Sequence, residues 1–122
     1  MEKILLVDDV ATNLKCVSKS LKDKYHFITA KSGEEALKLI KEEKPDLILL
    51  DICMPDMDGY EVLKRIKAEK DGADVPVVFL TGESDIESEV KGRELGAVDF
   101  IRKPFMPSAL IDSIQKVLGQ NR

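Results

Sequence analysis

The chain has 122 residues, with 19 basic and 23 acidic side chains and a formal net charge of −4. This length suits one domain with one core, and 43% hydrophobic with 34% charged residues is typical of a soluble globular protein rather than a disordered or membrane-spanning one. The acidic balance argues against the broad basic surface of a nucleic-acid-binding protein.

The cysteine and histidine content excludes several kinds of site. Cys16 and Cys53 lie far apart and His26 is the single histidine, so zinc ribbons, histidine-rich metal sites and a dense disulfide framework are excluded. The apolar run at residues 4–7 is too short for a signal-peptide core, and no run approaches the roughly 20 residues of a membrane span. We therefore expect a cytosolic domain with reduced thiols.

Five short apolar runs are typical of buried strands. They are ILLV, HFITA, DLILL, VVFL and VDFI, at residues 4–7, 26–30, 46–50, 77–80 and 98–101. Four of them are rich in Ile, Leu and Val without polar alternation, which suits parallel strands that helices cover on both faces. The run at 26–30 is weaker, and we expect it at an edge of the sheet.

The segments that separate or follow these runs have apolar residues at helical spacing. The stripes are Leu14, Val17 and Leu21; Ala36, Leu37 and Ile40; Val62, Leu63 and Ile66; Ile86, Val90 and Leu95; and Leu110, Ile111, Ile114, Val117 and Leu118. Because strands alternate with helices, the sequence predicts an α/β domain whose five-stranded parallel sheet has helices on both faces.

Helix boundaries carry their own signals. A Ser-x-x-Glu capping box opens the second and fourth helices, at residues 32–35 and 84–87. Gly96 is placed to close the fourth helix, and Pro107 fits the first turn of the fifth.

Polar residues end four of the five predicted strands. Asp8 and Asp9 end the first, Asp51 the third, Thr81 the fourth, and Arg102 and Lys103 the fifth. Because ligands bind at the carboxyl ends of the strands in an open α/β sheet, we expect these groups at one edge. If the strand order is 2-1-3-4-5, the first and third strands are neighbours and the three aspartates converge.

This set of groups points to phosphoryl transfer. Neighbouring carboxylates repel one another and favour recruitment of a cation, and oxygen ligands favour Mg²⁺ over zinc. The Thr81 hydroxyl and the Lys103 ammonium would complete a site for phosphate oxygens. Since a carboxylate can accept a phosphoryl group as an acyl phosphate, we expect Asp51 to be the nucleophile and Asp8 and Asp9 to hold the metal.

Four motifs resemble those of response-regulator receiver domains of two-component signalling, similar to chemotaxis regulators. They are VDD at residues 7–9, LLDICMPDMDG at 49–59, LTGE at 80–83 and KP at 103–104. The resemblance covers essentially the whole chain and makes residues 1–122 one receiver domain. It implies a flavodoxin-like fold with strand order 2-1-3-4-5, phosphorylation by a sensor histidine kinase or phosphotransfer protein, and slow autodephosphorylation.

The resemblance also implies a metal site. Asp51 matches the phosphorylated aspartate, Asp9 matches the direct metal ligand, and Asp8 matches the acid that acts through water. The backbone carbonyl of Cys53 matches the third protein ligand. The implied cofactor is Mg²⁺, held by Asp8, Asp9, Asp51 and Cys53.

Further residues match positions around the phosphoryl group. Thr81 matches the switch hydroxyl, Phe100 the aromatic switch residue and Lys103 the phosphate-binding lysine. The side chains of Cys53 and Glu83 match the pair that modulates hydrolysis. Cysteine departs there from the commoner polar or acidic residue, and since it neither orients water well nor adds charge, the phosphate lifetime stays open.

Each of these residues also has a structural interpretation. Asp8 and Asp9 could form a helix N-cap pair, and Asp51 could cap the following turn. Phe100 could be static core, although alternation along its strand places it opposite Lys103, which suits a ring that moves between buried and exposed rotamers. The occurrence of all these groups at strand ends favours the functional interpretation.

Three functions of different classes compete. The first is a phosphorylation-gated signalling module that catalyses its own phosphorylation and dephosphorylation, and is not a metabolic enzyme. It would present an altered surface, at residues 84–95 and 98–118, to an output protein or domain. We expect no direct binding of nucleic acid or membrane, and phosphorylation-dependent homodimerisation through the same surface stays open, as does a position within a longer chain.

The second function is a binding module that keeps the fold without the chemistry, and the third is a metal-dependent phosphatase. Against the binding module, every residue that the phosphoryl chemistry needs is present: both metal-binding acids, the acceptor aspartate, the hydroxyl and the lysine. Against the phosphatase, the sequence offers no cap segment and no second acid placed as a proton donor after Asp51. The sequence therefore favours the signalling module.

Overall fold

The computed structural model describes residues 2–8, 25–52, 59–70, 72–81, 86–102 and 107–120. The elements are β1 (Lys3–Val7), β2 (His26–Ala30), α2 (Gly33–Glu43), β3 (Leu47–Asp51), α3 (Gly59–Ala68), β4 (Val77–Thr81), α4 (Ile86–Glu94), β5 (Asp99–Arg102) and α5 (Pro107–Gln120). The helix predicted around residues 14–21 lies outside these ranges. Within them, no helix combines the length and the hydropathy needed to cross a bilayer.

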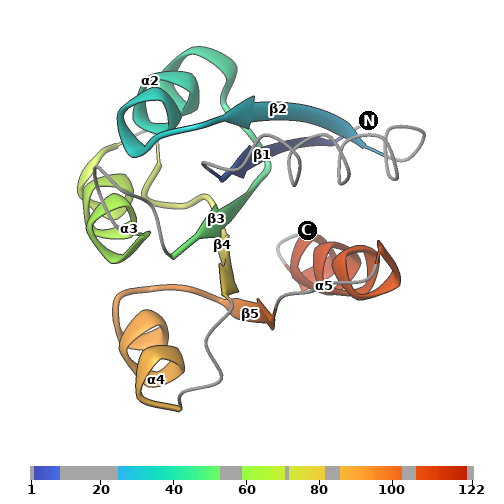
Figure 1. Ribbon diagram of the computed structural model, residues 1–122. Coiled ribbons are helices and arrows are strands. Elements are labelled where there is room, and N and C mark those ends of the chain that lie inside the picture. The colour runs from blue at the N-terminus through green and yellow to red at the C-terminus, as the bar shows by residue number, and fades with distance from the viewer. Residues whose placement is uncertain are drawn as a thin grey trace.

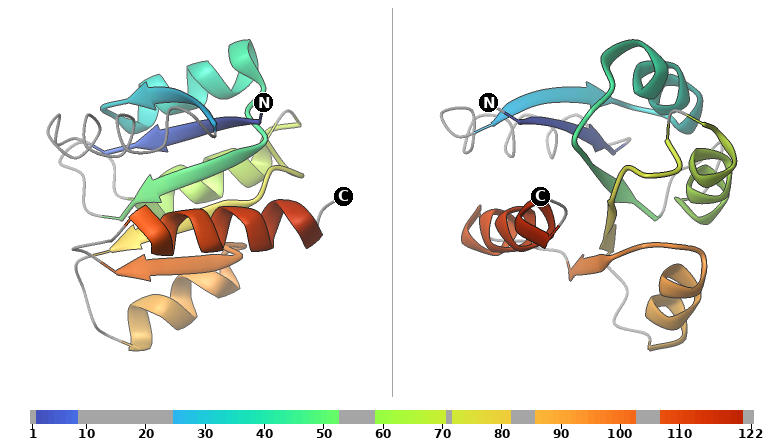
Figure 2. Two further views of the ribbon diagram at one scale, coloured as in Figure 1. Left: turned by 90° about the vertical axis from the view of Figure 1, so that its right-hand side faces the viewer. Right: turned by 180° about the vertical axis from the view of Figure 1, so that it is seen from behind.

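The strands form one five-stranded sheet in the order β2-β1-β3-β4-β5, and every neighbouring pair is parallel. Helices α2, α3 and α4 lie on one side of the sheet and α5 on the other (Figure 1). The predicted flavodoxin-like fold and strand order are confirmed. Because all strands run in the same direction, their carboxyl ends share one edge of the sheet (Figure 2).

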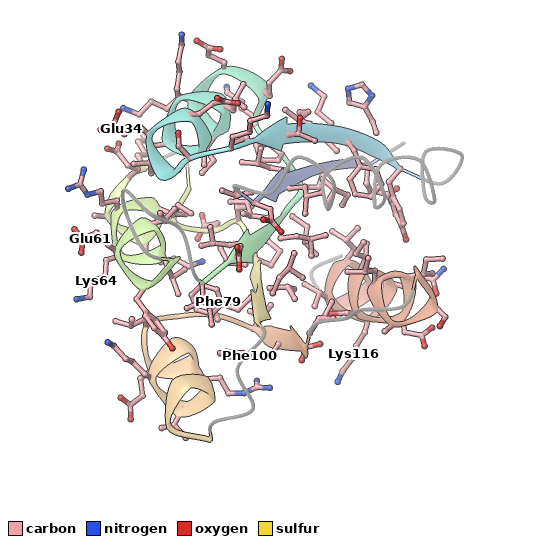
Figure 3. All side chains as sticks on the ribbon, viewed as in Figure 1. Glu34, Glu61, Lys64, Phe79, Phe100 and Lys116 are labelled. Atoms are coloured by element: carbon pink, nitrogen blue, oxygen red, sulfur yellow. The ribbon has the colours of Figure 1, made fainter. Side chains whose placement is uncertain are left out.

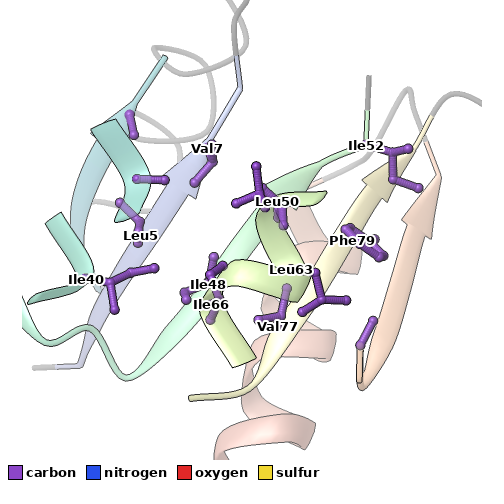
Figure 4. Close-up of a cluster of buried hydrophobic side chains, with 14 residues drawn as sticks. Leu5, Val7, Ile40, Ile48, Leu50, Ile52, Leu63, Ile66, Val77 and Phe79 are labelled. Carbon is purple, nitrogen blue, oxygen red and sulfur yellow. The ribbon is translucent and has the colours of Figure 1, made fainter. Parts of the chain in front are cut away.

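The three central strands are buried on both faces, which explains their unbroken apolar sequences. Successive residues of β1 alternate between two cores. Ile4 and Leu6 pack in the core that includes residues of α5, whereas Leu5 and Val7 pack in the core under α2 and α3 (Figure 4). Two separate apolar layers therefore hold the centre of the sheet.

The outer strands are less buried. β2 exposes His26 and Thr29, as expected for an edge strand. β5 forms the other edge, and its Asp99 and Phe100 are only half-buried. The sequence pattern of β5 predicts fuller coverage, but a strand at the end of the order has a neighbouring strand on one side only.

The helix boundaries agree with their sequence signals. The Ser32 side chain accepts a hydrogen bond from the Glu35 N–H at 3.2 Å and caps α2. Gly96 follows α4 with φ of 116°, and its N–H donates to a carbonyl in the last turn at 3.1 Å. Pro107 is the first residue of α5. The side chains of the capping box at residues 84–87 lie outside the described part.

Helix α4 faces the sheet with a different side from the predicted one. The prediction buries Val90 and Leu95, but Val90 is 49% exposed, whereas Leu95 is half-buried. Gly92 is buried, and it lies nearly opposite Val90 because two helical residues span about 200°. The side chain of Ile86 is not among those described. Helix α4 therefore meets the sheet at a residue that has no side chain.

Truncation of Leu63 tests the core beneath α3. Leu63 is fully buried, so Leu63→Ala should lower the free energy of unfolding by about 2–5 kcal/mol through lost burial and a residual cavity. Lys64 is exposed on the same helix, and Lys64→Ala should change this energy by less than about 0.5 kcal/mol. Urea denaturation measures both variants, and equal midpoints would contradict the assigned core.

Candidate functional site

Two buried carboxylates lie at the carboxyl ends of adjacent strands. In the pairing of β1 with β3, Val7 lies opposite Leu50, so Asp8 and Asp51 occupy the next position along each of these two adjacent segments. Asp8 is fully buried and Asp51 is 2% exposed. The structure thus brings these two predicted site residues to one place at the edge of the sheet.

Backbone hydrogen bonds to the flanking strands fix this edge. The Asp8 N–H donates to the carbonyl of Ala30 in β2 at 3.0 Å. On the other side, Asp51 lies opposite Leu80 of β4, and the N–H of Ile52 donates to the Leu80 carbonyl at 3.1 Å. Each carboxylate is therefore carried by backbone that a neighbouring strand holds in position.

Gly59, the first residue of α3, lies directly against the backbone of Asp51. Its N–H donates to the Ile52 carbonyl at 2.7 Å. A Cβ atom at Gly59 would lie 2.6 Å from the Asp51 carbonyl oxygen and 2.7 Å from the Ile52 Cα atom. Since both are backbone atoms in the strand end, the close approach requires glycine. In the sequence, Gly59 is distinguished only as the last residue of the motif at 49–59.

The two carboxylates suit a hard divalent cation. Buried anions are costly unless a partner compensates their charge, and carboxylate oxygens are the ligands that Mg²⁺ prefers. Within the described ranges, no group of three or more His, Cys, Asp or Glu side chains could hold a metal ion. Asp9 and Cys53 lie outside those ranges, so the described residues supply Asp8 and Asp51 from the predicted set.

The other predicted residues are described in part. Thr81 is the last residue of β4, opposite Arg102 of β5, so its backbone lies at the same edge of the sheet as Asp51; its side chain is not described. Glu83 and Lys103 lie outside the described residues.

Phe100 is half-buried on β5 and contacts Phe79 of β4. The two ring centroids lie 5.4 Å apart with the planes tilted by 58° (Figure 3). Phe100 packs against the core under α2 and α3, whereas the next residue, Ile101, belongs to the core that includes α5. The alternation expected along this strand is therefore present, and the ring lies between the core and solvent.

A polar network next to Phe100 was not predicted from the sequence. Arg93 Nη2 of α4 lies 3.7 Å from Asp99 Oδ1 of β5. Ser113 Oγ of α5 donates to Asp99 Oδ2 at 2.8 Å. Arg93 stands in a run of mixed charges typical of an exposed face. The one feature of the sequence that could have indicated this network is Ser113, a polar residue among the apolar positions of α5.

Comparison with known proteins identifies the family. The family model of the response regulator receiver domain matches residues 4–115. Over 118 residues the chain is 43% identical to a probable transcriptional regulator, ycf27, of Guillardia theta, in a match that covers 96% of this chain and 45% of that protein. The chain belongs to the response regulator receiver domain family of two-component signalling. It spans less than half the length of this curated relative.

Solved structures agree with this assignment. The chemotaxis protein CheY4 of Vibrio cholerae superposes with a TM-score of 0.92 at 35% identity, covering 96% of this chain and 98% of that chain. The receiver domain of the sensor histidine kinase PA1611 from Pseudomonas aeruginosa superposes with a TM-score of 0.88 at 28% identity, covering 97% and 98%. That structure has a magnesium ion coordinated in its active-site cleft.

Substitution of Gly59 tests its contact with the strand end. In Gly59→Ala the new Cβ would collide with the backbone of Asp51 and Ile52, so the free energy of unfolding should fall by about 1–3 kcal/mol. A Cβ atom at Gly119, near the end of α5, would meet nothing within 4 Å, and Gly119→Ala should be neutral or slightly stabilising. Thermal denaturation of the two variants compares them, and equal effects would contradict the close approach.

Proposed function

We propose that residues 1–122 form a phosphoacceptor signalling domain that accepts a phosphoryl group on Asp51 in the presence of Mg²⁺. The proposal is supported by the two buried carboxylates, Asp8 and Asp51, at the ends of adjacent central strands. An oxygen of Asp51 attacks the phosphorus of a phosphohistidine on a sensor histidine kinase or phosphotransfer protein. The P–O bond forms as the P–N bond breaks, the imidazole nitrogen leaves, and Asp51 becomes an acyl phosphate.

Four groups of the chain would hold the ion: Asp8, Asp9, Asp51 and the backbone carbonyl of Cys53. When bound, Mg²⁺ neutralises negative charge on the carboxylates and on the phosphoryl oxygens. Burial of Asp8 and Asp51 supports this assignment because a divalent cation would offset the cost of placing two carboxylates together in a buried position. The magnesium ion in the cleft of the PA1611 receiver domain gives further support.

The remaining site residues stabilise the phosphoryl group and set how long it stays on Asp51. The Lys103 ammonium balances charge on the phosphoryl oxygens, and the Thr81 hydroxyl donates a hydrogen bond to one of them. In dephosphorylation, water attacks the phosphorus, inorganic phosphate leaves and the Asp51 carboxylate is restored. Cys53 and Glu83 flank the phosphoryl group and set the rate of this step. The domain therefore catalyses its own modification and is not a metabolic enzyme.

Phosphorylation alters the surface formed by α4, β5 and α5. Thr81 follows the phosphoryl group, and Phe100 moves between exposed and buried positions. The half-buried state of Phe100 on an edge strand supports this role. The partner is a downstream output protein or domain, and phosphorylation-dependent homodimerisation on the same surface is an alternative use. A cytosolic location without direct binding of nucleic acid or membrane stays a prediction.

Phosphorylation of Asp51 can be tested by intact mass after incubation with acetyl phosphate. With Mg²⁺ the protein should gain one phosphoryl group that is lost at high pH, because an acyl phosphate is labile there. Asp51→Asn should gain none, since the amide cannot accept the group, whereas Asp112→Asn, exposed on α5, should behave as the wild type.

Persistent labelling of Asp51→Asn would refute the assigned acceptor. If folded wild-type protein with bound Mg²⁺ gains no mass from acetyl phosphate or from a phosphorylated histidine kinase, a binding module without the chemistry takes its place.

Magnesium should stabilise the folded protein. An ion that binds the native state at 100 times its Kd adds about 2.7 kcal/mol to the free energy of unfolding, which raises the melting temperature of a small domain by several degrees. Asp8→Asn removes one buried carboxylate and should abolish most of this shift, whereas Asp112→Asn should retain it. Differential scanning calorimetry with and without Mg²⁺ measures the shift, and an equal shift in Asp8→Asn would exclude Asp8 from the site.

A further inference from the structure

Three aromatic rings form a row on the face of the sheet that carries α3 and α4. Tyr60 of α3 meets Phe79 of β4 edge-on, with ring centroids 5.6 Å apart. Phe79 in turn meets Phe100 of β5 with centroids 5.4 Å apart. Phe79 is fully buried, whereas Tyr60 and Phe100 are half-buried. The row therefore runs from α3 across two strands to the edge of the sheet.

Helix α4 contacts this row through three consecutive residues. Lys91 Nζ lies 4.4 Å from the centroid of the Tyr60 ring, and Arg93 Cζ lies 5.6 Å from the centroid of the Phe100 ring. Both distances are within the range of a cation–π contact. Between the two cations, Gly92 lies directly against the rings, and a Cβ atom there would collide with the Phe100 ring.

Arg93 also contacts the backbone and side chains around Phe100. Its guanidinium pairs with Asp99 at 3.7 Å and donates to the Val98 carbonyl at 3.4 Å. The same Asp99 carboxylate accepts hydrogen bonds from the Phe100 N–H and from Ser113 Oγ of α5, each at 2.8 Å. One side chain of α4 is thus connected to the ring of Phe100, to the strand that carries it and, through Asp99, to α5.

We propose that Arg93 is a positioning residue for Phe100: it holds the ring against the buried row and ties α4 to β5. Gly92 leaves the space that the ring occupies in this position. When α4 moves away, the cation–π contact and the ion pair with Asp99 break together, and the ring is released. This inference deepens the proposed switch and rests on it for its signalling consequence, but the ring position is a property of the unphosphorylated protein.

The position of the ring can be measured by NMR of unphosphorylated protein with ¹³C-labelled phenylalanine. The chain has four phenylalanines, and the variant Phe100→Leu assigns the signal. Arg93→Ala should move the Phe100 ring shifts toward those of a solvent-exposed ring. Amide exchange in α4 and β5 should become roughly two- to fivefold faster, the loss expected for one exposed cation–π contact. Arg93→Lys keeps the charge and should give a smaller change.

A matched control separates this role from a general loss of stability. Arg65 is an exposed arginine in an ion pair with Glu61 on α3, at 3.3 Å, and Arg65→Ala should leave the Phe100 signal unchanged. Gly92→Ala, whose Cβ meets the ring, should displace the Phe100 signal with Arg93 intact. The proposal is overturned if Arg93→Ala matches Arg65→Ala, or if exchange rises equally in α2. Because no phosphoryl donor is used, failure of Asp51 labelling would not affect this result.

Discussion

The pairing of β1 with β3 is the constraint on which the site depends. It sets Asp8 beside Asp51, two buried carboxyl groups at the ends of adjacent strands. Apolar packing fixes the position of β1, because its alternate residues enter different cores. A slip of one residue would turn every side chain of the strand to the wrong face. The two cores therefore determine the relative position of the two carboxyl groups.

Much of this arrangement follows from the sequence. Strands buried on both faces leave unbroken apolar runs, and an acid directly after such a run must lie at the edge of the sheet. For β1 and β3 both signals are strong. The sequence fails at α4, where charged residues dominate and the apolar positions are too few to define a face. The burial of Gly92 in place of Val90 was therefore not predictable from periodicity.

Other parts of the site depend on contacts between distant segments. The requirement for Gly59 arises from the approach of α3 to the end of β3, and the local sequence around Gly59 does not encode this distance. The hydrogen bond between Asp99 and Ser113 joins residues 14 positions apart on different elements. Such contacts follow from the packed fold, and neither local propensity nor a motif encodes them.

Helices α3 and α4 contact the sheet in different ways. Helix α3 lies against the backbone of Asp51 and Ile52 with no side chain between them, so a shift of the strand end toward α3 acts directly on the helix backbone. Helix α4 also meets the sheet at a glycine, but Gly92 contacts the side-chain rings of Phe79 and Phe100 rather than backbone. The flanking Lys91 and Arg93 side chains, which contact rings as well, can rotate about single bonds. A displacement of Asp51 is therefore transmitted directly to the backbone of α3. On the side of α4, side chains can rotate to accommodate the same displacement.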